Sequence, residues 1–170
     1  MALATSITVN LGAKQSATLD LGASVANITK NFALTLTSGT AAGQADKIFA
    51  DTRTLAASTN EDLDLAGTLT DPSGATVVFA KVKAILICAA SGNTNNVVVG
   101  GAASNAFSSM FGDATDKVVI RPGGHVSLSV GSGDLNAYAV TAGTGDLLRV
   151  ANSGAGTSVT YDIIVIGTSA

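Results

Sequence analysis

The sequence predicts an all-β protein, built as an antiparallel two-sheet sandwich that is jelly-roll-like and carries an N-terminal arm or extra edge strands. Between residues 81 and 167, short apolar runs rich in valine and isoleucine alternate with tight patches of Gly, Asn, Ser, Thr or Asp. Such evenly punctuated runs are typical of sandwiches. We expect about eight to ten strands and no helix of normal length, which excludes a parallel α/β architecture. The runs are KVKAILICA, NNVVVGGA, DKVVIRP, HVSLSVG and VTYDIIVIG.

The chain is expected to divide near residue 60. Residues 1–59 are predicted to be an N-terminal arm of polar strands, packed on the sandwich or on a neighbouring subunit, and residues 60–170 are predicted to be the sandwich core. The first part, to about residue 31, buries too little to be an independent fold, so we expect an arm laid over a neighbour or a strand exchanged between subunits. Two ordinary edge strands are the alternative interpretation.

Within residues 1–59 the strand signals are weak alternations of apolar and polar residues. Residues 39–47 are small and polar and predict a loop, whereas residues 47–57 fit a strand or a short helix, of which we favour the strand. The weak strands are expected over residues 6–11, 15–21 and 31–37, with turns at Gly12, Gly22 and Ser38–Gly39.

After residue 60 the signals are sharper. Alternating leucines predict a strand over residues 63–69, and Asp71-Pro72-Ser73-Gly74 predicts a type I turn because proline presets φ at its second position. The return strand, residues 76–79, leads into residues 81–88. The apolar run over residues 84–90 predicts a strand covered on both faces. Its core residues are expected to be Ile85, Leu86 and Ile87.

The last predicted strands follow the same rules. Pro122 lacks an N–H and separates a strand over residues 118–120 from one over residues 126–130. In the final strand, residues 158–166, one face is expected to carry Val159, Tyr161, Ile163 and Val165, and the other Asp162, Ile164 and Ile166. In residues 105–113, the spacing of Phe107, Met110 and Phe111 fits one helical turn. That cluster is interpreted either as a plug that closes one end of the sandwich or as an anchor for a partner.

Composition limits the class of partner. Only 12% of the 170 residues are charged and the net charge is −3, without a basic stripe, so no nucleic acid is expected. No apolar run is long enough to cross a membrane, and the first residues lack the charged lead and apolar segment of an export signal. Small uncharged side chains lose little rotamer entropy on burial, so the surface suits a protein that packs against neighbours.

No residue cluster predicts chemistry, so we expect no enzyme, with no catalytic, cofactor-binding or metal-binding residues. Cys88 is the single cysteine and is expected to be a small buried hydrophobe. His125, the single histidine, is expected to be a turn residue, since zinc sites and triads need partners. The stretches at residues 143–146 and 154–157 are glycine-rich, but they lack the lysine and helix of a phosphate loop and predict hairpin turns.

Three aspartates are considered for weaker alternatives. Asp113, Asp116 and Asp134 could supply oxygen ligands to calcium if their loops meet, although no D-x-D-x-D-G series is present. Asp113 with Asp116 is the one carboxylate pair considered for a glycan hydrolase, which needs two carboxylates across a cleft. We favour a binding role without catalysis or metal over both of these alternatives.

The order of several segments resembles small virion structural proteins of tailed bacteriophages. The resemblance covers roughly residues 60–170, and its most specific phrases are VVVGGAASNAF and DLLRVANSGAGTSVTYDIIVIG. Within that group the chain is similar to jelly-roll decoration, or cement, proteins, which sit on the capsid exterior as dimers or trimers and clamp neighbouring capsomers. The resemblance implies no catalytic residues.

What the resemblance implies is a structural role. The expected function is to stabilise a phage capsid by bridging neighbouring major capsid protein subunits as a homodimer or homotrimer, on the exterior of a virion made in the host cytoplasm. The alternative is a tail, fibre or receptor-binding sandwich module. A glycan-binding role is disfavoured because the chain has no Trp, two Tyr and five Phe, and sugar rings usually stack on aromatic side chains.

Overall fold

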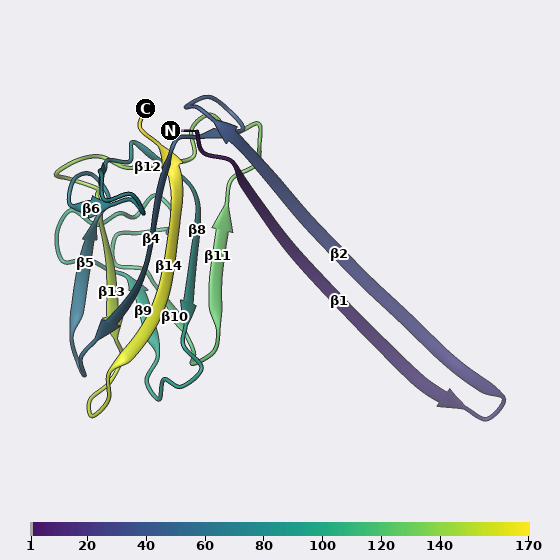
Figure 1. Ribbon diagram of the computed structural model, residues 1–170. Helices are drawn as coiled ribbons and strands as arrows, with labels where there is room; N and C mark the ends of the chain where they lie inside the picture. Colours follow the sequence, from purple (N-terminus) through teal and green to yellow (C-terminus); the bar gives the residue numbers. More distant parts are fainter. Residues whose placement is uncertain (1) are drawn as a thin grey trace.

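The computed structural model describes residues 2–170, and within that range it contains fourteen β-strands and no helix. An antiparallel sandwich makes up most of the molecule, and a long hairpin projects from one end of it (Figure 1). The prediction of an all-β sandwich is confirmed. The jelly-roll detail is finer than this and stays a prediction.

Two sheets face each other in the sandwich, and each joins strands that are far apart in the chain. All of their pairings are antiparallel. The five-stranded sheet has the order β11 (His125–Ser129), β8 (Lys81–Ala89), β14 (Val159–Thr168) and β4 (Lys47–Leu55), and β12 (Tyr138–Ala139) also pairs with β8. The four-stranded sheet has the order β10 (Lys117–Ile120), β9 (Val97–Gly100), β13 (Leu147–Asn152) and β5 (Asn60–Asp64).

A small hairpin, β6 (Leu69–Thr70) with β7 (Thr76–Val77), follows β5. The predicted turn joins the two strands: the Gly74 N–H donates to the Asp71 carbonyl at 2.9 Å. The Asp71 carboxylate also accepts the Ser73 N–H at 2.8 Å, which holds the turn. The single strand predicted over residues 63–69 is wrong, because β5 ends at Asp64 and a turn precedes β6.

The core lies between the two sheets and is lined by alternate residues of β14. Its Val159, Tyr161, Ile163 and Val165 side chains are fully buried. Their neighbours point to the outer face, where Ile164 keeps 36% of its surface exposed. This two-face assignment of the last strand is confirmed. On β8, Ile85 and Ile87 are buried as predicted, whereas Leu86 is only half-buried because it shares the outer face with Ile164.

The bulky cluster between β9 and β10 closes the sandwich without a helix. Phe107 is buried in the core, and Met110 and Phe111 pack against it while partly exposed. Only a turn forms there, in which the Phe111 N–H donates to the Ser108 carbonyl at 2.8 Å. The predicted helical turn is therefore wrong, because packing on the core determines the conformation of so short a segment.

The projecting hairpin, which we call the arm, contains β1 (Thr5–Leu19) and β2 (Gly22–Ser38). The short β3 (Gln44–Ala45) pairs in parallel with the end of β2. Gly12 lies inside β1 opposite Thr29, so the turn predicted at Gly12 is wrong; the chain reverses at Asp20 and Leu21, just before Gly22. Residues 47–55 form β4, as favoured, and β4 belongs to the sandwich, which thus includes residues before position 60.

Burial within the four-stranded sheet predicts a stability difference between two valines. Val150 is fully buried and Val119 is 57% exposed. We expect Val150→Ala to lower the free energy of unfolding by about 2 kcal/mol, because it removes buried methyl groups and leaves a cavity. Val119→Ala, the matched control, should change it by less than about 0.5 kcal/mol. Urea unfolding followed by circular dichroism measures both, and equal losses would contradict the core assignment.

Candidate functional site

The arm is a ribbon with two chemically different faces. Its strands pair so that odd-numbered residues of β1 and even-numbered residues of β2 share a face. One face carries Ile7, Val9, Leu11, Ala13, Ala17 and Leu19 from β1 with Leu36, Leu34, Phe32, Ile28 and Ala26 from β2; we call it the apolar arm face. The opposite face is mainly polar but also includes Ala33, Val25 and Ala23; its polar residues are Ser6, Thr8, Asn10, Lys14, Ser16 and Thr18 with Thr35, Asn31, Thr29 and Asn27.

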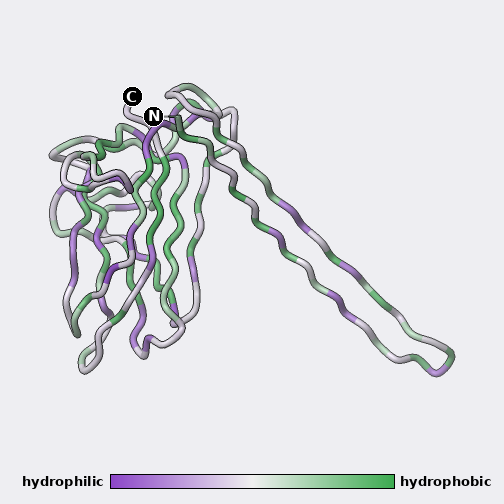
Figure 2. Tube along the Cα trace, viewed as in Figure 1, coloured by the Kyte–Doolittle hydropathy of each residue, from purple (hydrophilic) through white to green (hydrophobic). Residues whose placement is uncertain are grey.

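Only the base of the apolar arm face is covered. Leu34 and Leu36 are buried in a small cluster with Ala84 of β8 and Ile166 of β14, and Ile7 packs against it. Toward the tip the same face is open, with Leu11 59% and Ile28 61% exposed. The arm moves away from the sandwich along its length (Figure 1), and apolar and polar residues alternate along both of its strands (Figure 2).

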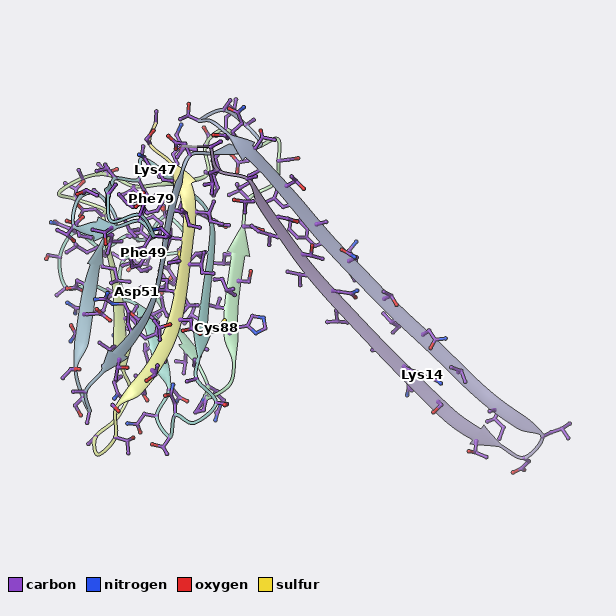
Figure 3. All side chains as sticks on the ribbon, viewed as in Figure 1. Lys14, Lys47, Phe49, Asp51, Phe79 and Cys88 are labelled. Atoms are coloured by element: carbon purple, nitrogen blue, oxygen red, sulfur yellow. The ribbon has the colours of Figure 1, made fainter. Side chains whose placement is uncertain are left out.

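The outer face of the five-stranded sheet continues the surface on which the arm base packs. Leu86 pairs with Ile164 and Ala84 with Ile166, so two apolar rows lie side by side across β8 and β14. The next row pairs Cys88 with Asp162. Cys88 lies on β8 of the sandwich and Lys14 about midway along the arm (Figure 3).

An open groove separates the first part of β1 from this outer face. It has a volume of about 500 Å³. One wall is residues 5–10 of the arm, including Ile7 and Val9; the opposite wall is formed by Leu86, Ile164 and Ser127 with their neighbours. The groove therefore lies between two largely apolar walls, the apolar arm face and the outer sheet face.

Lys30 of the apolar arm face and Asp162 of the outer sheet face are charged, and both lie outside the groove lining. Lys30 lies opposite Leu11 on the apolar arm face, between the rows of Phe32 and Ile28. On the sheet, Asp162 follows the row of Ile164, and its carboxylate accepts a hydrogen bond of 2.6 Å from the Thr52 hydroxyl. The apolar arm face and the outer sheet face thus carry charges of opposite sign.

Of the residues singled out in the sequence, His125 and Cys88 lie on neighbouring strands, and the Asp116 N–H donates to the Asp113 carbonyl at 3.2 Å. His125 is exposed at the start of β11, opposite Cys88, and burial raises the pKa of the half-buried Cys88 thiol. Asp113 is exposed, and hydrogen bonds from Thr115, first from its backbone N–H, lower its pKa. Hydrogen bonds from the backbone N–H groups of Ala137 and Asn136 lower the pKa of the Asp134 carboxylate. Within residues 2–170, no three His, Cys, Asp or Glu residues gather to hold a metal ion.

Two polar features were missed by the sequence analysis. Lys83 is buried at one end of the sandwich, where its amine donates to the Asp134 carbonyl at 2.8 Å and burial lowers its pKa. At the opposite sheet edge, the Tyr161 hydroxyl donates to Glu61 at 2.7 Å, and Arg53 also binds Glu61 through Nε at 2.7 Å. This cluster connects β4 and β14 to β5 of the facing sheet. Its residues belong to different strands, so only the folded structure shows that they meet.

Comparison with known proteins supplies no family. No protein-family model matches the chain, and no curated protein matches it. Among solved structures, a chain from Bacillus endospore appendages, described as a novel family of disulfide-linked pili, has 15% sequence identity and a TM-score of 0.37. The match covers 78% of this chain and 97% of that one, and a likeness this weak supports no inference. Among the described residues, no helix is long and apolar enough to cross a membrane.

The buried tyrosine predicts a dependence of stability on alkaline pH. Burial, together with the bond to Glu61, raises the pKa of Tyr161 above its ordinary value of 10.0. The resulting stabilisation is fully present below the unfolded pKa of about 10 and is lost as the pH rises above it, because only the unfolded chain then ionises. We expect a loss approaching about 1.4 kcal/mol per pH unit above that value.

Urea unfolding across this alkaline range measures the slope. Tyr161→Phe should be less stable at neutral pH and should show a shallower alkaline decline than the wild type. Tyr138→Phe is the matched control, and it should keep the wild-type slope. The same slope in all three proteins would contradict this role of the Tyr161 hydroxyl.

Proposed function

We propose that this protein is a structural protein of a phage virion, which decorates the capsid exterior and bridges neighbouring major capsid protein subunits. One observation carries the proposal: apolar or small uncharged side chains occupy outward positions on the arm and on both sheets. The resemblance of residues 60–170 to decoration proteins points to the same role. A protein of this kind acts through the surface it buries.

The outer face of the four-stranded sheet is the surface proposed to contact the shell. One row across it consists of Val119, Val98, Ala151 and Asn60, on four adjacent strands. The next row holds Arg149 and Asp62, whose side chains neutralise each other through two hydrogen bonds of 2.8 Å. Such a face is dehydrated at low cost because its side chains lose little rotamer entropy and its ion pair is already formed.

Attachment through several copies would strengthen a weak contact. A standard specific interface buries about 1,600 Å² in total. When an oligomer touches several capsomers, each later contact becomes intramolecular, which raises the overall affinity by a factor on the order of a hundred or more. A modest shell contact on each copy is therefore sufficient.

The location of the protein on virions of the phage that encodes it tests the proposal. We expect quantitative mass spectrometry to find many copies per particle, and electron cryomicroscopy to place their density on the outside of the shell. Density confined to the tail or fibres would support the alternative tail module, and absence from purified particles would overturn the virion role.

A surface variant separates the proposed shell contact from general stability. Val119→Lys places a charge at the edge-strand end of its row, on the exposed face proposed to contact the shell, so we expect it to reduce shell occupancy at least roughly tenfold in co-sedimentation. Ala155→Lys, in the exposed loop between β13 and β14, is the control and should bind shells as the wild type does. Equal binding by wild type and Val119→Lys would place the shell contact elsewhere.

A further inference from the structure

We propose that the apolar arm face binds the outer face of the five-stranded sheet of a second copy, and that two copies exchange their arms reciprocally about a two-fold axis. This inference rests on the proposed function and adds the surface through which two copies associate. Its test uses the isolated protein, so its outcome does not depend on the virion role. The partner surface is defined by the rows of Ile164 with Leu86 and of Asp162 with Cys88.

The first argument is that the two surfaces already pack together at the arm base. There, Leu34 and Leu36 of the arm cover Ala84 and Ile166 of the sheet, which demonstrates that the surfaces are compatible. Beyond the base both surfaces continue with the same chemistry but move apart (Figure 1). A two-stranded ribbon with an open apolar face is marginally stable in water, so a covering surface is needed.

The second argument is charge complementarity. Lys30 is the single charged residue on the apolar arm face, and Asp162 stands at the end of the apolar rows on the outer sheet face. Apolar rows flank Lys30 on both sides, at Phe32 and at Ile28. A partner arm that places Lys30 over Asp162 therefore places an apolar row over Ile164.

Cross-linking tests the exchange with one substitution. Lys30→Cys introduces a thiol that should face the native Cys88 of the second copy, beside Asp162. Facing β-layers are about 10 Å apart, which is too wide for a disulfide, so a short bismaleimide is the probe. We expect a covalent dimer on a denaturing gel.

Three controls make the result decisive. Lys14→Cys places the same new thiol on the polar face of the arm and should give little dimer, and so should Lys30→Cys combined with Cys88→Ala. An intramolecular link in Lys30→Cys would mean that the arm folds onto its own sheet and would overturn the exchange. A wild-type protein that sediments as a monomer at all concentrations would also overturn it, whatever its location on the virion.

Charge reversal provides an independent test. We expect Lys30→Asp and Asp162→Lys each to raise the dimer dissociation constant roughly tenfold, because each places like charges together twice in the symmetric dimer. The double variant should recover most of the affinity, whereas Lys14→Asp should have little effect. Analytical ultracentrifugation measures these constants, and a double variant as weak as the sum of its parts would exclude the Lys30–Asp162 contact.

Discussion

The structure depends on covering both faces of β14, the strand between β8 and β4. Its inner face is buried by the four-stranded sheet, whereas its outer face is covered by the arm only where Leu34 and Leu36 lie over Ile166. The arm thus completes one end of the sandwich and leaves the apolar row at Ile164 open to the groove. In the proposed arm exchange, folding of the domain and association of two copies would therefore involve the same strand.

The arm has one largely polar face and one largely apolar face. Its polar face carries hydroxyl and amide side chains that remain hydrated, and its apolar face is interrupted by a single charge, Lys30. A charge within an apolar face weakens nonspecific association and favours a partner that offers an anion at the matching place. In the proposed arm exchange, Lys30 would supply this specificity.

The sequence predicted features that depend on neighbours along the chain. The two faces of β14 and the turn at Asp71 follow from local alternation and from proline and glycine geometry. The apolar arm face was missed because it appears only when the register of β1 against β2 is known, and polar residues between its members gave the impression of a polar arm. Lys83 and the Glu61–Tyr161 bond were missed because both depend on contacts between distant segments.

The position of β14 also determines when the sandwich can form during synthesis. It is the last of the fourteen strands, yet it lies at the centre of its sheet and pairs with β4, made more than a hundred residues earlier. Until the ribosome has released this segment, β4 and β8 lack the strand that joins them. Long-range pairing of this kind folds slowly, and the edges of β4 and β8 that pair with β14 stay exposed until it is in place.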